Sequence, residues 1–366
     1  MLRVMMLSTD LEPGGYPLRL ARMARFLPDV GVEPIVGCLA PPGPLSAVLA
    51  SAGIETFACD ARGRLDALCL RRLARQVRRL DPAIIHSGLF HANVAVRLAG
   101  RPDRSRPVIT STATIEIERR WHLWGEALTS GLSDLHIVNA PPVREHVCND
   151  LCFRRDRVVC VPNGIDLRRL DAVQPADRTE FDIPAEVPLI VWAGRLDPIK
   201  NIATFVDIVG EVRKTRDVRA LLIGEGPEHR HISTWIARAN LGGVIHMTGW
   251  RNDVTAWLKT SDVLLFPSRT EGSPNTVIEA MACGCPVVAS DLPACRDLIA
   301  DGIDGWLCPP GDRAAFARAV EDALSDQERR TDRSGRARRR VRRRHDIRSV
   351  VRMLHAAYER ALSRTQ

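Results

Sequence analysis

Glu271 and Glu279 lie in a segment whose residue types could bind a polar ligand. Residues 262–267 before it and residues 286–290 after it are short apolar runs, typical of buried strands. The stretch between these strands is predicted to be a loop followed by one helix. Glu271 is expected in the loop, and Glu279 inside the helix on the same face as Asn275.

The start of this predicted helix is suited to binding an anion. Ser273 is a good N-cap and Pro274 a good first helical residue, because proline lacks an N–H group that would be unpaired there anyway. We therefore expect the helix to begin near Ser273. Its exposed N–H groups and positive dipole end favour a phosphate beyond the carboxyl edge of the sheet.

Two carboxylates beside a phosphate are repelled unless they face other parts of the same ligand. A carboxylate accepts two hydrogen bonds from vicinal hydroxyls, so a ligand with a sugar at each end and phosphates between them fits both glutamates and the helix start. In the simpler alternative, Glu271 is a solvated loop residue and Glu279 an ordinary helix residue.

A basic loop at residues 194–201 offers cations for such phosphates. It follows a predicted strand at residues 187–193, and ligands of open parallel sheets bind beyond the carboxyl ends of the strands. Arg195 and Lys200 could converge there on a diphosphate, although a solvated basic turn is the alternative. The chain has no Asp-x-Asp motif and no cluster of metal-ligating residues beside this loop, so no metal ion is expected.

The corresponding loop of the first half carries a glycine pair. Gly14 and Gly15 follow a predicted strand at residues 3–8 and can bring backbone N–H groups against a phosphate, at a helix expected from about Pro17. A plain turn is the alternative. The pair departs from Gly-x-Gly-x-x-Gly, which argues against a nicotinamide cofactor.

Length and composition indicate a globular protein of two domains. The chain has 366 residues, of which 45% are hydrophobic and 26% charged, and no apolar run is long enough to span a membrane. The first residues run into a strand without the pattern of a secretory signal, and ten scattered cysteines lack a Cys-x-x-Cys pair. These features predict a cytoplasmic protein with reduced thiols.

Short apolar runs alternate with amphipathic segments in both halves of the chain. This repetition predicts an α/β fold of two Rossmann-like domains, each built on a parallel sheet. The pattern lapses near Asp166 and resumes at residue 187, so a domain boundary is expected there. Residues 347–362 are predicted to form an amphipathic terminal helix.

The segment Glu-Gly-Ser-Pro-Asn-x-x-x-Glu-Ala-Met-Ala-x-Gly-x-Pro-Val-Val at residues 271–288 resembles the donor-site signature of retaining glycosyltransferases of family 4. Gly-Arg-Leu-x-x-x-Lys-x at residues 194–201 is similar to a second signature of that family. The resemblance implies the GT-B fold, in which two Rossmann-like domains with parallel sheets face each other across a cleft. It implies an acceptor-side domain at residues 1–167, a nucleotide-sugar domain at residues 168–345, and a helix at residues 346–366 that packs back on the first domain.

The resemblance also implies roles for the residues of the site. Glu279 would hold the ribose diol, and Glu271 the hydroxyls of the donor sugar. Arg195 and Lys200 would stabilise the departing nucleoside diphosphate in place of a metal ion. The phosphates would be bound at the helix start and the glycine pair, by Gly272, Ser273, Pro274, Asn275, Thr276, Gly14 and Gly15.

Residues 84–93, Ile-Ile-His-Ser-Gly-Leu-Phe-His-Ala-Asn, are similar to a family pattern His-x-His-x-x-His-Ala-Asn. The middle histidine of that pattern is Gly88 in this chain. If the usual sugar-contacting residue is the middle histidine, this chain lacks it, and His91 becomes the candidate catalytic histidine. His86 is the other candidate, although a histidine at a strand end is often a structural residue.

Taken with the resemblance, these features predict a retaining, metal-independent glycosyltransferase of the hexosyltransferase type. Its donor would be a nucleotide-diphosphate sugar, with no cofactor, and its acceptor a glycan or lipid-linked saccharide of cell-envelope or exopolysaccharide synthesis. Two alternatives stay open: a nucleotide-sugar epimerase of GT-B fold, and a non-catalytic nucleotide-sugar-binding protein.

The formal net charge of +8 includes two basic blocks, at residues 71–79 and 336–344. The first belongs to the predicted acceptor-side domain, and the second leads into the terminal helix expected to pack there. We therefore expect these blocks to hold the protein at the anionic inner face of a membrane. Solvated helix faces and a soluble sugar acceptor are the alternatives. Neither block interleaves aromatic residues that could stack on bases, so nucleic acid is not an expected partner.

Overall fold

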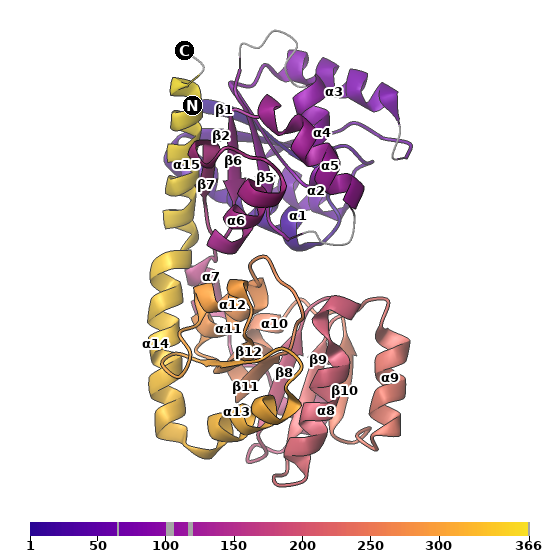
Figure 1. Ribbon diagram of the computed structural model, residues 1–366, viewed down its shortest axis with the longest axis vertical. Helices are drawn as coiled ribbons and strands as arrows, with labels where there is room; N and C mark the ends of the chain where they lie inside the picture. The colour runs from indigo at the N-terminus through magenta and orange to yellow at the C-terminus, as the bar shows by residue number, and fades with distance from the viewer. Residues whose placement is uncertain (64–65, 100–105, 116–119, 365–366) are drawn as a thin grey trace. The chain divides into compact units, whose positions relative to one another are not determined.

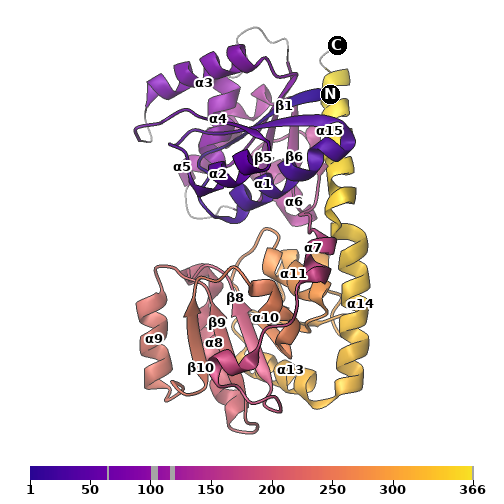
Figure 2. The same cartoon turned by 180° about the vertical axis from the view of Figure 1, so that it is seen from behind.

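The computed structural model describes residues 1–63, 66–99, 106–115 and 120–364. The chain forms two compact units, each an α/β structure with its own sheet (Figures 1 and 2). The first unit comprises Met1–Gly164 together with His345–Gln366, and the second comprises Ile165–Arg344.

The first unit is built on a parallel sheet with the strand order β3-β2-β1-β4-β5-β6-β7. Its strands are β1 (Leu2–Ser8), β2 (Val32–Cys38), β3 (Glu55–Ala58), β4 (Ile84–Gly88), β5 (Val108–Thr112), β6 (Leu135–Val138) and β7 (Val158–Cys160). Its helices are α1 (Gly15–Phe26), α2 (Pro44–Ser51), α3 (Ala67–Leu80), α4 (Phe90–Ala99), α5 (Arg120–Thr129), α6 (Pro141–Asp150) and α15 (Ile347–Ser363), and η1 (Leu27–Val30), η2 (Ser130–Leu132) and η3 (Arg155–Arg157) are short 3-10 turns.

Apolar side chains on both faces explain why this sheet is parallel and covered on both sides. On one face, β1 and β2 share a core with α1, α2 and α15. On the other face, the same strands share a core with α3 and α4. Strands and helices alternate along this half as the sequence predicted, which confirms the Rossmann-like architecture.

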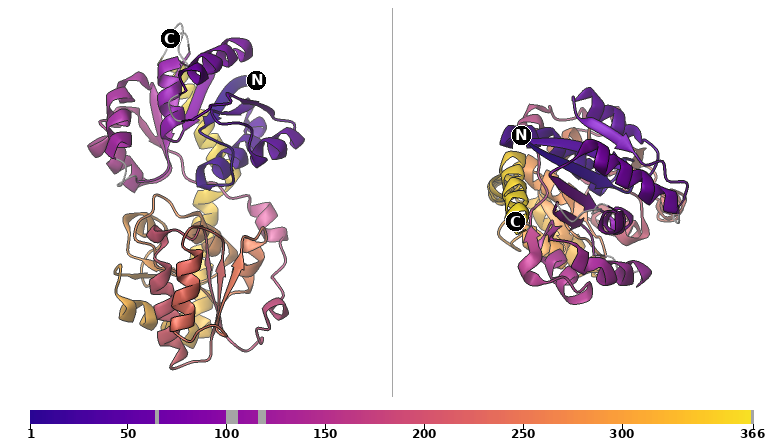
Figure 3. Two further views of the ribbon diagram at one scale, coloured as in Figure 1. Left: turned by 90° about the vertical axis from the view of Figure 1, so that its right-hand side faces the viewer. Right: turned by 90° about the horizontal axis from the view of Figure 1, so that it is seen from above.

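The terminal helix α15 packs on the first unit, as the resemblance implied. Its apolar face is buried in the same core as β1 and α1, and Figure 3 shows the helix (yellow) beside this sheet. The residues of that face are Ile347, Val350, Val351, Leu354, Ala357, Tyr358 and Ala361. Their helical spacing is the signal that predicted the helix.

The second unit is built on a parallel sheet with the strand order β10-β9-β8-β11-β12-β13. Its strands are β8 (Leu189–Ala193), β9 (Arg219–Ile223), β10 (Ile245–Gly249), β11 (Val263–Phe266), β12 (Val287–Ser290) and β13 (Trp306–Cys308). Its helices are α7 (Leu167–Ala172), α8 (Ile202–Arg213), α9 (His229–Arg238), α10 (Val254–Thr260), α11 (Asn275–Cys283), α12 (Pro293–Leu298), α13 (Arg313–Ser325) and α14 (Gln327–His345), with the 3-10 turns η4 (Arg178–Phe181) and η5 (Pro198–Lys200). One apolar core joins the strands to helices on both faces.

The basic block at residues 336–344 lies in α14, and most of its arginines are ion-paired within the second unit. Arg338 and Arg342 both pair with Asp171, Arg340 pairs with Asp304, and Arg344 pairs with Asp297. Much of the block's charge is therefore neutralised locally, while Arg339 and Arg343 are exposed, and its role in holding the protein at a membrane stays a prediction. The sequence could not show these ion pairs, because these aspartates are far from the block along the chain.

Among the described residues, no helix is both long enough and apolar enough to cross a lipid bilayer.

Candidate functional site

The loop after β8 is held in place by close contact with the loop after β9. An added Cβ at Gly224 would lie 1.8 Å from the carbonyl oxygen of Gly194, and one at Gly226 would lie 2.3 Å from that of Leu196. Both glycines also have positive φ, so no other residue fits there without backbone movement. A hydrogen bond of 2.8 Å from the Leu196 N–H to the Glu225 carbonyl completes the contact. The loop that carries Arg195 and Lys200 is thereby fixed at the carboxyl end of the sheet.

Lys200 and Glu271, which are far apart in the sequence, meet at this end of the sheet. The Lys200 Nζ lies 2.6 Å from the Glu271 Oε1, and only 20% and 10% of the two side chains are exposed. The ammonium also lies 5.7 Å from the centre of the Phe266 ring. A backbone hydrogen bond of 2.8 Å from Arg269 to Ile199 ties the two loops together. A shielded cation and carboxylate are thus positioned side by side.

Arg195 takes a different direction from Lys200. It pairs with Asp197 of the same loop, and 74% of its side chain is exposed. The Asp197 carboxylate also accepts from the Ile199 N–H and so begins η5. Arg195 is therefore not part of the Lys200–Glu271 pair in this structure, and its predicted convergence on a diphosphate stays a prediction.

Helix α11 begins at Asn275, one residue later than predicted. Pro274 is the N-cap, with an extended ψ of 107°, and no side chain caps the helix start. The expectation that Ser273 is the N-cap and Pro274 the first helical residue is therefore wrong. The fixed φ of proline suits the cap position as well as the first turn, so the sequence alone did not separate the two.

The beginning of α11 is anchored to the loop that carries Lys200. The Thr276 hydroxyl donates a 3.0 Å hydrogen bond to the Ala193 carbonyl, at the last residue of β8. Gly272 is buried just before the helix, while Ser273, Asn275 and Glu279 are half-buried. Glu271, Lys200 and the first turn of α11 thus lie together at one end of the sheet, and their roles in a nucleotide-sugar site stay predictions.

The glycine pair of the first unit forms the start of α1. Gly14 is the N-cap, with φ −154° and ψ 172°, and Gly15 is the first helical residue, so the helix begins two residues before the predicted Pro17. No acidic side chain lies in the first turn, and no atom lies within 4 Å of an added Cβ at Gly15. This helix start can present its N–H groups to an anion.

His86 is a structural residue of the first unit's core. Its Nδ1 lies 2.8 Å from the Tyr358 hydroxyl of α15, and its Nε2 lies 2.6 Å from the Ser111 hydroxyl of β5. Burial, together with the charge of Arg19, lowers the pKa of His86 to about 3. The imidazole is therefore neutral, and both of its nitrogens are occupied by protein partners.

Tyr16 fills the space that a side chain at position 88 would need. An added Cβ at Gly88 would lie 1.9 Å from the ring carbon Cζ of Tyr16 and 2.1 Å from its hydroxyl oxygen. Tyr16 is buried, and burial raises its pKa to about 12, against smaller opposing effects of Arg19 and Ser111. The sequence analysis noted Gly88 as a departure from the family pattern but missed Tyr16, which directly follows the glycine pair.

His91 lies in the first turn of α4, within a group of aromatic rings. Its ring centre is 5.1 Å from Phe90, 5.9 Å from Trp121 and 5.5 Å from His122. The side chain is half-buried. The structure thus places His91 apart from His86, beside the first turn of α5.

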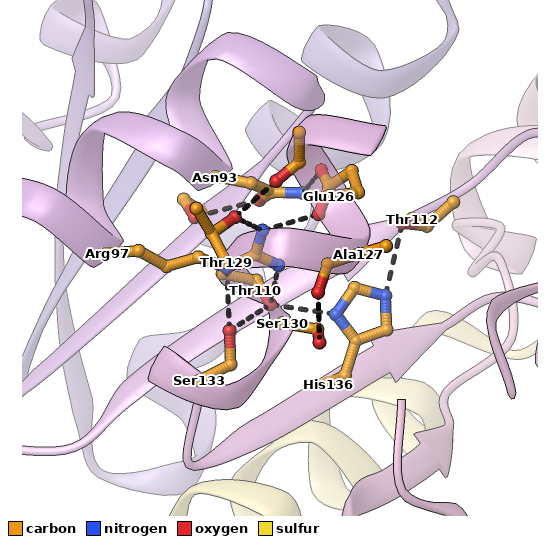
Figure 4. A network of polar contacts seen from close by, with 12 residues as sticks. Asn93, Arg97, Thr110, Thr112, Glu126, Ala127, Thr129, Ser130, Ser133 and His136 are labelled. Atoms are coloured by element: carbon orange, nitrogen blue, oxygen red, sulfur yellow. Dashed lines mark hydrogen bonds and ion pairs between the residues drawn. The ribbon is translucent and has the colours of Figure 1, made fainter. Parts of the chain in front are cut away.

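A buried polar network fixes the elements around His91 (Figure 4). Asn93 donates to the Ser111 carbonyl and to Glu126 of α5, each at 3.0 Å. Arg97, whose side chain is fully buried, pairs with Glu126 at 2.5 Å and donates to the Ser133 hydroxyl at 2.9 Å. Removing one partner of a buried ion pair leaves an uncompensated charge, so this network holds α4 and α5 in one arrangement on β5.

Two family models match consecutive parts of the chain. One, described as Glycosyltransferase Family 4, matches residues 13–169. The other, described as Glycosyl transferases group 1, matches residues 187–326. The chain belongs to glycosyltransferase family 4. The second match contains the Lys200–Glu271 pair and α11, and the first contains the glycine pair and His91.

Curated relatives match part of the chain. The lipopolysaccharide core biosynthesis glycosyltransferase LpsE of Rhizobium meliloti is 29% identical over 199 residues, which are 54% of this chain and 56% of the relative. The UDP-Gal:alpha-D-GlcNAc-diphosphoundecaprenol alpha-1,3-galactosyltransferase of Escherichia coli is 25% identical over 248 residues, 64% of this chain and 63% of the relative. The chain therefore spans between half and two thirds of the length of these relatives.

Solved structures match the chain over nearly its whole length. HepE of Anabaena, solved in complex with UDP, is 19% identical with a TM-score of 0.84, and the match covers 98% of this chain and 100% of HepE. Sucrose-phosphate synthase of Thermosynechococcus elongatus is 18% identical with a TM-score of 0.84, and the match covers 100% of both chains. At these identities the likeness shows the fold, and it confirms the predicted GT-B architecture.

Proposed function

We propose that this protein is a retaining glycosyltransferase that moves a sugar from a nucleotide-diphosphate sugar to a glycan or a lipid-linked saccharide. The observation that carries the proposal is the shielded Lys200–Glu271 pair, held between the end of β8 and the start of α11. The names of LpsE and of the Escherichia coli galactosyltransferase support an acceptor from cell-envelope glycan synthesis. The complex of HepE with UDP supports a nucleotide donor.

Each candidate site residue of the second unit has a proposed contact with one part of the donor. Glu279, one turn into α11, binds the ribose diol, and Glu271 binds hydroxyls of the sugar that is transferred. The N–H groups at the start of α11 bind phosphate oxygens, together with the preceding loop. The residues of this phosphate-binding segment are Gly272, Ser273, Pro274, Asn275 and Thr276.

Lys200 and Arg195 are proposed to neutralise the charge that develops on the departing nucleoside diphosphate. Lys200 is already beside Glu271, so one ammonium orients the carboxylate toward the sugar and offers its remaining N–H groups to a phosphate oxygen. Arg195 is exposed and has a long side chain, so it can turn from Asp197 to a bound phosphate. Two cations in these positions make a divalent metal ion unnecessary.

Retention of the anomeric configuration is proposed to follow from attack of the acceptor hydroxyl on the same face of the donor sugar from which the nucleoside diphosphate leaves. The bond between the sugar C1 and the phosphate oxygen breaks, and a bond from C1 to the acceptor oxygen forms. The leaving phosphate oxygen takes the proton of the acceptor hydroxyl, so no enzyme carboxylate becomes covalently attached. In the first unit, His91 is proposed to contact the reacting sugar, and the α1 start at Gly14 and Gly15 to bind phosphate.

We further propose that the protein works in the cytoplasm, as a peripheral protein at the inner face of the membrane. A lipid-linked acceptor would be reached there, and the name of the Escherichia coli relative includes such an acceptor, alpha-D-GlcNAc-diphosphoundecaprenol. An epimerase or a non-catalytic binding protein would use the same donor site, and the experiment below separates them.

The proposal is tested first by ligand binding and then by turnover. A panel of nucleotide sugars is screened for protection against thermal unfolding, because a ligand that binds the folded state stabilises it by mass action. Titration calorimetry with UDP and GDP then identifies the base. The stabilising donor should release its nucleoside diphosphate, and Lys200→Met should abolish this release while keeping the fold. A protein that binds the donor but neither releases its nucleotide nor transfers its sugar would be a non-catalytic binding protein. Conversion of the donor to an epimerised nucleotide sugar would show an epimerase.

A further inference from the structure

Helix α5 has its apolar side chains on the outside. Trp121, Trp124 and Leu128 follow the i, i+3, i+7 spacing of one helix face, and they are 51%, 67% and 86% exposed. The opposite face carries His122 and Glu126, which are buried. Leu123 packs toward the apolar core of β6 and α6.

This arrangement is the reverse of an ordinary surface helix. Such a helix turns its apolar stripe to the core and its polar face to water. Here the buried face is satisfied by polar contacts, since Glu126 pairs with Arg97 and accepts from Asn93. These contacts fix the orientation of α5, so the two tryptophans cannot turn inward without breaking a buried ion pair.

The neighbouring helix α3 presents a basic stripe on the same face of the sheet. α4 packs against both α3 and α5, and Figure 1 shows the three helices side by side. Arg71, Arg75 and Arg78 follow one face of α3 and are exposed. In the described part of the chain no acidic side chain pairs with them. They border a groove of about 700 Å³ between α3 and α4, whose apolar lining includes the exposed Leu98.

We propose that the outer face of α3, α4 and α5 docks on an anionic lipid membrane. Trp124 and Leu128 would enter the boundary between headgroups and acyl chains, where tryptophan is favoured, and the arginines of α3 would contact anionic headgroups. This inference deepens the proposed function, on which the choice of a membrane-bound acceptor rests. It assigns the attachment to the first unit and not to the arginines of α14.

A second copy of the chain is the competing occupant of this face. An isologous dimer would bring Arg71, Arg75 and Arg78 of two copies into one interface, and no acidic side chain among the described residues pairs with them. An anionic membrane supplies that counter-charge along with an apolar layer. The charge of the face therefore favours the membrane.

Vesicle flotation at low salt tests the proposal with two variants of this face. One is Trp124→Ser with Leu128→Ser, and the other is Arg71→Gln, Arg75→Gln and Arg78→Gln. Trp121 is left unchanged because it contacts His91. Two controls match them in the second unit: Ile303→Ser, an exposed apolar residue, and Arg339→Gln with Arg343→Gln, two exposed arginines of α14.

The wild type should bind vesicles that contain phosphatidylglycerol, and this binding should weaken as the salt concentration rises. It should not bind purely zwitterionic vesicles. Each arginine lost should lower binding about fivefold, which corresponds to ~1 kcal/mol. The α5 variant should bind the vesicles about tenfold more weakly, or weaker still. Both controls should bind them like the wild type. Equal binding by the wild type and the α5 variant would overturn the proposal. So would a wild-type dimer by light scattering that the α5 variant converts to monomer.

Donor hydrolysis in the absence of lipid separates this inference from the proposed function. The α5 and α3 variants should hydrolyse the stabilising donor at the wild-type rate in solution. Loss of vesicle binding with intact hydrolysis supports the docking face. A wild type that binds vesicles through α5 but turns over no nucleotide sugar would contradict the proposed activity and leave the docking face standing.

Discussion

The contact between Tyr16 and Gly88 predicts strong coupling between two positions that are far apart in the sequence. Any side chain at position 88 must displace the Tyr16 ring, because an added Cβ would lie 1.9 Å from it. Gly88→His should therefore destabilise the first unit. Tyr16→Ala should do so as well, since it leaves a cavity where a buried ring lay.

The magnitudes follow from this geometry. Tyr16→Ala should lower the free energy of unfolding by about 3–5 kcal/mol, as large-to-small aromatic substitutions in cores do. Gly88→His alone should cost about 1–3 kcal/mol or more, through overpacking and displacement of the ring. In the double variant the imidazole occupies the space left by the phenol. Its cost should therefore fall below the sum of the single variants by at least about 1–2 kcal/mol.

Urea unfolding of the four proteins, followed by circular dichroism, measures this coupling. Gly131→Ala is the matched control in the same unit, because no atom lies within 4 Å of its added Cβ. The control should unfold like the wild type. Strictly additive single and double variants, or a Gly88→His variant as stable as the wild type, would refute the claim that Tyr16 replaces a side chain at position 88.

Three further predictions concern the donor site and the core. Glu279→Ala should weaken nucleotide binding by roughly ten- to a hundredfold, the effect of a lost charge-assisted hydrogen bond, whereas Glu271→Ala should mainly lower turnover; calorimetry and steady-state rates that change in neither variant would show the assignment to be wrong. Activity should survive excess EDTA, and activity lost on chelation and restored by magnesium or manganese would contradict the proposed use of Lys200 and Arg195. The pKa of His86 is about 3 in the folded protein, against an ordinary value of 6.5, so the folded state binds fewer protons than the unfolded state and the free energy of unfolding should fall as pH drops from about 6.5 toward 3. Urea titrations at several pH values should show a shallower fall for His86→Gln than for the wild type. An identical pH dependence of the two proteins would contradict a neutral, buried His86.

The strands and their parallel order could be predicted from the sequence because local patterns determine them. Continuous apolar runs such as residues 189–193 and 263–266 are buried on both faces, and the alternation with helices leaves few topologies. The terminal helix was predicted from its apolar spacing, and the resemblance supplied the surface on which it packs.

Contacts between distant positions could not be predicted in the same way. The sequence placed Lys200 and Glu271 in one site but did not show that they form an ion pair. It showed that Gly88 departs from a family pattern, but the side chain that fills the space comes from Tyr16, more than seventy residues earlier. The sequence could not show that Arg338, Arg340, Arg342 and Arg344 are ion-paired, because their aspartate partners are distant in the chain.

Helix α5 shows a different limit of sequence reasoning. An apolar stripe at helical spacing normally indicates the buried face. In α5 the buried face is instead the one that carries Glu126, because Arg97 and Asn93 on α4 satisfy it. Only the three-dimensional partners of Glu126 reveal which side of the helix faces outward.

The most direct test of the central claim is the anomeric configuration of the product. The nucleotide sugar that best protects the protein against thermal unfolding is incubated with it and an acceptor in the presence of EDTA, and proton NMR follows the new glycosidic bond. We predict a product with the anomeric configuration of the donor, formed by the wild type and not by Lys200→Met. A product of inverted configuration would contradict the proposed same-face mechanism, and no transfer from any stabilising donor would contradict the function itself.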